Sequence, residues 1–139
     1  MQPGYTILEH PADIGIEARG DTLQQVFEQA AKGMMSVILD PGSVDSVESH
    51  RLDLRADDVE QLLVRWLAEI LYYFDGRRFL AKEFVIDRMT ATRLEAVIRG
   101  ESHLPHKHRM NMDVKAVTYH QLCVRNDTQG WYARVFLDI

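Results

Sequence analysis

The pattern of apolar and polar residues predicts a chain built from strands and two long helices. Stretches in which apolar and polar residues alternate are typical of strands with one buried face. The predicted strands are residues 5–9, 14–19, 51–55, 79–89, 93–99, 114–125 and 131–137. Two polar segments are predicted to be loops, residues 43–50 and a His-rich stretch from Gly100 to about Asp113.

Two other segments have the 3.6-residue apolar repeat of amphipathic helices. The first begins at Thr22, where Gln25 completes a capping box, and it ends before Pro41-Gly42. The second has the clearest repeat in the chain, with Asp57 predicted as its N-cap and Asp75-Gly76 as its end. Its apolar positions are Val59, Leu62, Leu63, Trp66, Leu67, Ile70, Leu71 and Phe74.

The order of these elements predicts an α+β fold. The late strands follow one another with short turns, which favours antiparallel pairing. Each amphipathic helix needs an apolar surface to cover, and a sheet face supplies it. We therefore expect two long amphipathic helices packed on a mostly antiparallel or mixed β-sheet. With 139 residues and no linker-like segment, residues 1–139 are expected to form a single compact domain.

Composition and charge narrow the class of protein. The chain is 46% hydrophobic and 27% charged, which is ordinary for a globular domain, and its apolar stretches are too short to cross a membrane. Cys123 is the only cysteine, which favours a reducing compartment such as the cytoplasm, and we interpret it as a small strand residue. The net charge of −5 disfavours strong direct nucleic-acid binding.

The sequence contains no standard enzyme signature. It has no phosphate-binding loop, no dinucleotide-binding glycine pattern, no Gly-x-Ser-x-Gly elbow and no paired CxxC. We therefore assign no catalytic residue and expect the protein not to be a free-standing enzyme.

Acidic groups at the two ends of the chain are the first candidate site. Asp13 follows His10-Pro11-Ala12 between the first two predicted strands, where it either belongs to a site or simply caps a turn. Asp138 and the terminal carboxylate of Ile139 are adjacent, and the alternative there is an ordinary frayed terminus. If the two ends meet, three carboxylates converge and require a cation. Oxygen ligands favour Ca²⁺, Mg²⁺ or Mn²⁺.

Histidines form the second candidate. His103, His106 and His108 lie in the polar loop, either as a transition-metal site or, as we favour, as surface residues. His120 is interpreted as a hydrogen-bonded residue of the strand predicted over residues 114–125. On that strand Thr118 and His120 share one face, and Lys115 and Tyr119 the other. Such a face either contacts a partner protein or is an ordinary polar surface at the edge of a sheet.

Five motifs, spread over nearly the whole chain in the family's order, resemble the archease family. They are His10-x-Ala12-Asp13-Ile14-Gly15, Trp66-Leu67-x-Glu69-Ile70-Leu71, Gly100-Glu101, Lys115-Ala116-Val117-Thr118-Tyr119-His120 and Asp138-Ile139. The resemblance implies an accessory protein of an RtcB-type RNA ligase. It would promote guanylylation of the ligase histidine and multiple turnover in tRNA splicing and RNA repair.

The resemblance also implies one divalent cation, Ca²⁺ first with Mg²⁺ or Mn²⁺ as alternatives, held by Asp13, Asp138 and Ile139. Further residues are candidates to support these ligands or to contact the partner. They are His10, Lys115, Thr118, His120 and His108. The chain departs from the family at Pro11, where Thr is usual, and over residues 104–108, where Leu-Pro-His-Lys-His replaces Asp-Pro-Glu-x-His.

Two other function classes remain open from the residues alone. One is a small metal-dependent phosphoester hydrolase, in which Asp13 and Asp138 bind the metal and His108 or His120 is the base. The other is a non-catalytic protein-interaction module whose acidic corner is structural.

Overall fold

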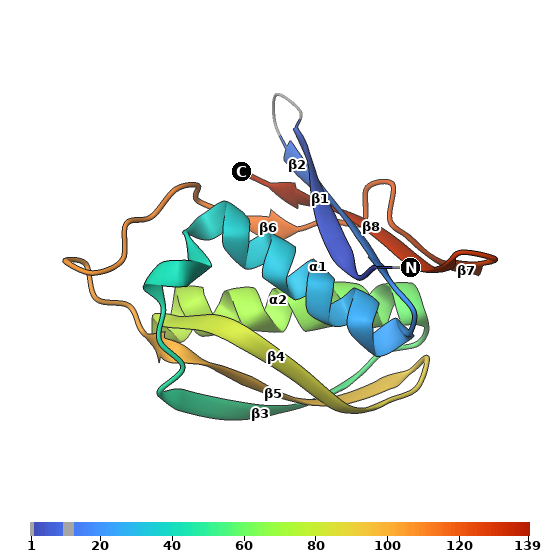
Figure 1. The fold of residues 1–139 in the computed structure, drawn as a ribbon, viewed down its shortest axis with the longest axis horizontal. Coiled ribbons are helices and arrows are strands. Elements are labelled where there is room, and N and C mark those ends of the chain that lie inside the picture. Colours follow the sequence, from blue (N-terminus) through green and yellow to red (C-terminus); the bar gives the residue numbers. More distant parts are fainter. Residues whose placement is uncertain (1, 10–12) are drawn as a thin grey trace.

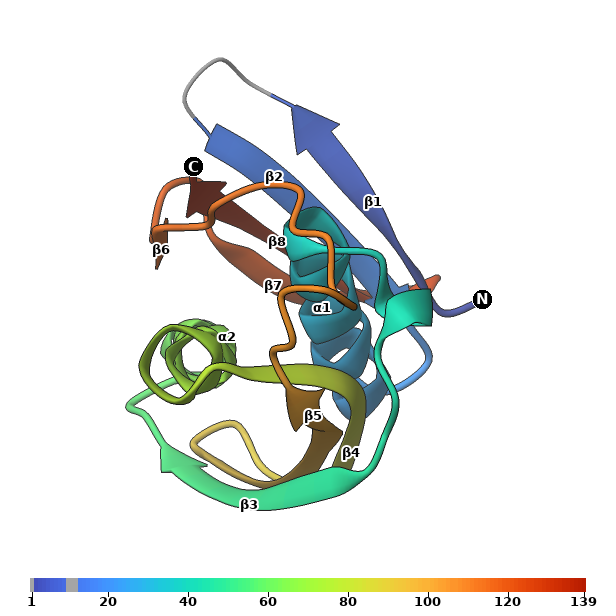
Figure 2. The ribbon, with the colours of Figure 1, turned by 90° about the vertical axis from the view of Figure 1, so that its left-hand side faces the viewer.

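Two helices lie between two antiparallel sheets in the computed structural model, which describes residues 2–9 and 13–139 (Figures 1 and 2). The helices are α1 (Leu23–Ile38) and α2 (Val59–Arg77), and a 3-10 turn, η1 (Pro41–Ser43), follows α1. The strands are β1 (Gly4–Glu9), β2 (Asp13–Gly20), β3 (Glu48–Arg55), β4 (Phe79–Met89), β5 (Arg93–Ser102), β6 (Ala116–Val117), β7 (Cys123–Asp127) and β8 (Gly130–Asp138).

One sheet joins the two ends of the chain, and the other is formed by the middle. The first sheet has the order β1-β2-β8-β6, and β7 also pairs with β8. The second has the order β3-β5-β4. All pairs are antiparallel. The predicted α+β class is therefore confirmed, with two sheets in place of the one that we expected.

The core fills the space between the sheets. Ile14, Ile16 and Ala18 of β2 point into it, as their alternation predicted. Trp66 of α2 is fully buried, and its indole N–H donates to the carbonyl oxygen of Phe27 in α1 at 2.9 Å. This bond fixes one helix against the other at the centre of the protein. No helix in the described ranges is long and apolar enough to cross a membrane.

Helix α1 begins where the capping signal predicted. The Thr22 hydroxyl accepts a hydrogen bond from the Gln25 backbone N–H at 3.1 Å, and the Gln25 side chain accepts one from the Asp21 N–H at 2.7 Å. Because both bonds satisfy donors that the helix itself leaves free, they define its first turn.

Both predicted ends of α2 were off by one or two residues. The N-cap is Asp58 rather than Asp57, because the Asp58 carboxylate accepts from the Gln61 N–H at 2.8 Å. The helix passes through Gly76 and ends at Arg77, and its C-cap, Arg78, has a left-handed φ of 54°. The Arg78 guanidinium lies 4.6 Å from the centre of the Phe74 ring, a cation–π contact that helps to offset the strain of that conformation.

Strand β4 has its predicted bounds, but three other boundaries were wrong. Strand β3 begins at Glu48, inside the predicted loop, and β5 continues to Ser102. The long strand predicted over residues 114–125 is instead two short strands, β6 and β7, separated by a turn. The Thr118 hydroxyl accepts from the His120 N–H at 3.2 Å, and Gln121 has a φ of 50°. This local bond and the left-handed residue break the extended backbone, so His120 is not a sheet residue.

Candidate metal and partner site

Asp13 and Asp138 are direct cross-strand partners. Strand β2 pairs with β8 so that Asp13 lies opposite Asp138, followed by Ile14 opposite Leu137. Both Ile14 and Leu137 are buried, which fixes the register, because a slip of one residue would turn them to solvent. Directly opposite residues point to the same side of a sheet, so the two carboxylates share the outer face. The condition posed above, that Asp13 lies beside Asp138, is therefore met.

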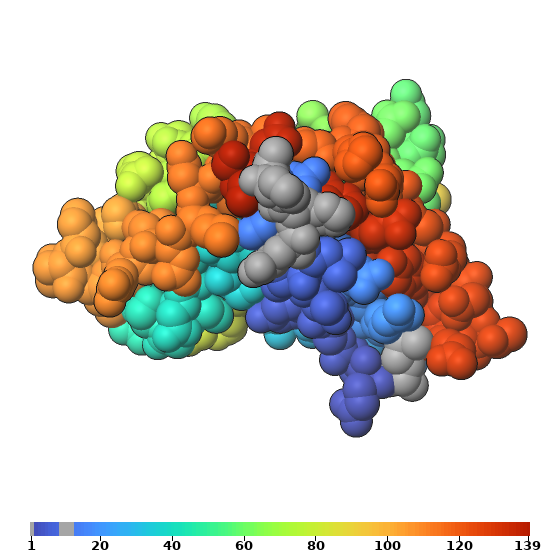
Figure 3. Space-filling view, turned by 90° about the horizontal axis from the view of Figure 1, so that it is seen from above, coloured from blue at the N-terminus to red at the C-terminus, as the bar shows by residue number. Residues whose placement is uncertain are grey.

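The end of β8 is held on its second side as well. Ala116 of β6 pairs with Asp138, and the Lys115 N–H donates to the Asp138 carbonyl oxygen at 2.8 Å. The Ile139 side chain is partly buried against the core. The last described residues are thus anchored against the sheet and the core. Figure 3 shows this side of the protein, with the C-terminal residues in dark red beside β2.

Asp13, Asp138 and Ile139 are here called the acidic corner, and their carboxylate oxygens are donors that fit a hard divalent cation. Two carboxylates directly opposite each other repel, and a cation between them removes that cost. In the described part of the chain, no group of three His, Cys, Asp or Glu side chains lies close enough to hold a metal. A third protein donor would therefore be the carboxylate of Ile139. The fourth candidate in this region, His10, lies outside the described residues.

The Lys115–His120 segment borders the corner. The Thr118 hydroxyl donates to the Phe136 carbonyl oxygen at 3.0 Å, and the same oxygen accepts the Thr118 backbone N–H at 3.0 Å. The His120 ring lies edge-on to the Phe136 ring at 5.7 Å between centroids. Thr118 and His120 therefore fix the turn to β8, while the side chain of Lys115 is exposed.

His108 belongs to a different cluster. Its ring is buried, its Nδ1 accepts from the Leu104 N–H at 2.9 Å, and its Nε2–H therefore donates to a Glu101 carboxylate oxygen at 2.9 Å. Because both ring nitrogens of His108 form hydrogen bonds within the protein, neither is free to act as a general base. The same carboxylate accepts from the Lys107 ammonium at 2.8 Å and the Asp45 N–H at 2.8 Å. These bonds, led by that from Lys107, lower the pKa of Glu101 to about 2.

The other two histidines of the loop do not complete a metal site with His108. Nδ1 of His103 lies 2.8 Å from the Arg78 guanidinium, and burial, aided by the Arg78 charge, lowers the pKa of His103. Within the described residues, its buried Nε2 has no hydrogen-bond partner. His106 is exposed. The surface-loop interpretation was therefore right for His106 and wrong for His108, which is buried because it satisfies Glu101.

Comparison with known proteins decides the family. Residues 5–139 match the model described as the Archease protein family (MTH1598/TM1083). The chain belongs to the archease family. It is 39% identical to the protein archease of Methanosarcina acetivorans, with 97% of this chain and 95% of that protein covered. It is 35% identical to the protein archease of Sulfurisphaera tokodaii, with 97% and 98% covered.

Solved structures of the archease family share the fold. The solution structure of Methanobacterium thermoautotrophicum protein 1598 matches with a TM-score of 0.83 at 32% identity, over 98% of this chain and 99% of that one. The crystal structure of a Thermotoga maritima archease, described as a possible chaperone, matches with a TM-score of 0.69 at 19% identity, over 95% and 94%. The predicted resemblance to the archease family is thereby confirmed.

Sequence reasoning missed the roles of two residues in the family's motifs. It noted Glu101 without a function, and the structure shows that this carboxylate anchors the loop after β5. It placed Tyr119 on a strand face, whereas Tyr119 lies at a turn with 63% of its surface exposed. A buried acid has no periodic signal in sequence, so only the tertiary contacts reveal Glu101.

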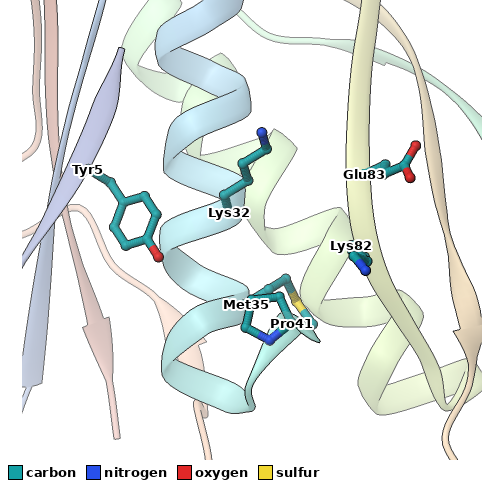
Figure 4. A pocket seen from close by; sticks show the side chains of 6 residues that line it. All are labelled: Tyr5, Lys32, Met35, Pro41, Lys82 and Glu83. Carbon is teal, nitrogen blue, oxygen red and sulfur yellow. The ribbon is translucent and has the colours of Figure 1, made fainter. Parts of the chain in front are cut away.

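The described surface of this archease has several hollows, and two of them border β1. One of about 370 Å³ adjoins the corner through Ile14 and is lined by Ile7, Ile14, Ser36, Val37, Asn111 and Met112. The other, of about 280 Å³, lies between the edge strands β1 and β4 over α1 (Figure 4). It is lined by Tyr5, Lys32, Met35, Pro41, Lys82 and Glu83.

Proposed function

We propose that this protein activates an RtcB-type RNA ligase, promoting guanylylation of the ligase histidine and multiple turnover in tRNA splicing and RNA repair. Membership of the archease family supports the partner class. The observation that carries the proposal for this chain is the pairing of Asp13 with Asp138 on an outward face of the sheet. Such a corner presents an acidic, cation-binding group to a partner.

Asp13, Asp138 and the carboxylate of Ile139 would hold the ion in this proposal. A divalent cation, Ca²⁺ or alternatively Mg²⁺ or Mn²⁺, supplies positive charge that neutralises phosphate oxygens during nucleotidyl transfer. The protein's own contribution is placement. Pairing of β8 with β2 on one side and β6 on the other holds the acidic groups on a rigid support. Covalent chemistry remains with the ligase.

The arrangement of the histidines does not favour the hydrolase alternative. A hydrolase would need a base beside the metal ligands. Both ring nitrogens of His108 are bonded within the buried Glu101 cluster. His120 packs its ring against Phe136 and holds the turn. The proposed role therefore belongs to an accessory protein.

The test is guanylylation of the cognate ligase with GTP and Mn²⁺ or Mg²⁺, with the archease at about one twentieth of the ligase concentration. We expect stimulation beyond the archease's own stoichiometry, and its loss in Asp13→Asn and Asp138→Asn. Asp57→Asn is the matched control, because Asp57 is exposed before α2 and the change in charge is the same. Absence of stimulation by the native protein would refute the ligase role. Stimulation that persists in both corner variants would refute only the metal role.

A further inference from the structure

Tyr119 is a large aromatic residue that the protein leaves in solvent. Its exposed fraction is 63%, and within the described ranges its side chain makes no hydrogen bond or ring contact. Tyr72 of α2, at 54%, is the other strongly exposed aromatic, but it lies edge-on to Tyr73 at 6.3 Å between centroids and covers Gly76. Tyr72 therefore has a local packing role that Tyr119 lacks.

The backbone that carries Tyr119 is held firmly. The preceding residue, Thr118, makes three hydrogen bonds, two to the Phe136 carbonyl oxygen and one from the His120 N–H. The Leu122 N–H donates to the Tyr119 carbonyl oxygen at 3.3 Å, and the Arg134 guanidinium donates to the Gln121 carbonyl oxygen at 3.0 Å. The free ring thus projects from a turn that is tied to β8 at both ends.

This turn adjoins the acidic corner. Strand β6 pairs Ala116 with Asp138 and Val117 with Leu137, and the turn follows directly. Tyr119 lies three residues from the partner of Asp138, on the same segment as the exposed Lys115. Lys115 therefore lies beside Asp138, and the turn that carries Tyr119 lies farther along the same edge of β8, beside Phe136.

We propose that Tyr119 is the anchor by which this protein docks on its ligase. The inference rests on the proposed function and identifies the contact that it requires. The ring enters an apolar pocket on the ligase, beside cationic groups that face Asp13 and Asp138. Charge complementarity favours such a partner, because a site that handles nucleotide phosphates is itself lined with cations.

The physical basis is the low cost of burying a ring that is already fixed. Tyrosine supplies a large contact area for two rotatable side-chain bonds, and a rigid turn removes the backbone entropy that docking would otherwise lose. Aromatic anchors of this kind dominate the affinity of many interfaces. Thr118 and His120 act as positioning residues, since their side chains bond to or pack on β8.

The experiment measures the Kd between the full chain and its cognate ligase by biolayer interferometry. The variants are Tyr119→Ala, Tyr119→Phe and, as the matched control, Tyr72→Ala, each checked by thermal unfolding. We expect Tyr119→Ala to weaken binding at least about tenfold without a lower unfolding midpoint. Tyr119→Phe keeps the ring and is expected to stay within about threefold of the native Kd, as is Tyr72→Ala.

The outcomes separate this inference from the proposed function. If the native protein binds and stimulates the ligase, and Tyr119→Ala does so with an unchanged Kd, the anchor is refuted and the ligase role stands. Equal losses in Tyr119→Ala and Tyr72→Ala would also refute it, because they would indicate a general surface effect. If the native protein does not bind the ligase, both proposals fail.

Discussion

A Cβ atom on Gly100 would lie 1.8 Å from the carbonyl oxygen of Leu80. Strands β4 and β5 shift register between Ala81 and Glu83, and the backbone of β4 comes unusually close to β5 at this point. The close approach explains why glycine precedes Glu101 in this chain. Only a residue without a side chain leaves room for the β4 carbonyl.

Gly100→Ala is expected to destabilise the protein by about 3 kcal/mol, because backbone atoms have to move to admit the methyl group. Denaturant unfolding measures the loss. Gly4→Ala is the control, since a Cβ there meets nothing within 4 Å, and it should change stability by less than about 0.5 kcal/mol. A similar stability for the two variants would contradict the tight β4–β5 contact.

Because Asp13 and Asp138 face each other, we predict that Asp138→Asn changes stability in opposite directions without and with a bound metal ion. In EDTA, Asp138→Asn is expected to raise stability by roughly 0.5 kcal/mol, because it removes a like-charge pair. With Ca²⁺ at about 100 times its Kd, the native protein should gain about 2.7 kcal/mol and the variant much less. Thermal unfolding at both conditions, repeated with Mn²⁺ and Mg²⁺, measures the difference. An equal gain in Asp138→Asn would place the ion elsewhere.

The Glu101 cluster predicts acid sensitivity. The folded-state pKa of Glu101 is about 2, below the ordinary value of 4.5. Because the folded pKa is depressed, this carboxylate stabilises the fold above pH 4.5, and the contribution is lost as pH falls from 4.5 towards 2. Glu101→Gln should therefore lower the unfolding midpoint at pH 7 and flatten its dependence on pH in that window. If Glu101→Gln left the pH dependence of the unfolding midpoint unchanged between pH 4.5 and 2, the depressed pKa would not belong to Glu101.

The turn at Thr118 is testable by amide hydrogen exchange. Thr118→Val removes the hydroxyl that accepts from the His120 N–H. We expect faster exchange at His120, because opening of the turn then breaks fewer bonds. Thr118→Ser keeps the hydroxyl and should keep the native rate, which separates the hydrogen bond from the loss of the methyl group. Slow exchange in the valine variant would mean that other contacts hold the turn.

Periodicity predicted the regular elements well. Strand β4 has its predicted bounds, since its pattern is uninterrupted, and α2 has the expected apolar face. The N-cap of α2 was missed by one residue, because Asp57 and Asp58 are equally suited to capping. The strand predicted over residues 114–125 failed, because a hydroxyl-to-amide bond within the segment competes with strand pairing, and alternation does not register it.

The candidate site was predictable only in part. Asp13 and Asp138 are 125 positions apart, and sequence alone showed what would follow if they met. The β2–β8 register brings them together. His108 was assigned to a polar loop because its sequence neighbours are polar. Its ring is buried where the Glu101 carboxylate at the end of β5 and the Leu104 N–H of the same loop bond to its two nitrogens.

The second strand, β2, and the last described strand, β8, are neighbours in one sheet although they lie near opposite ends of the sequence. During synthesis β2 leaves the ribosome early and has to wait until residues 130–138 have emerged before it gains this partner. A prematurely terminated chain therefore lacks the paired aspartates altogether, however well its middle sheet folds. The aspartate pair therefore forms only after β2 and β8 have closed on each other, late in the assembly of this sheet.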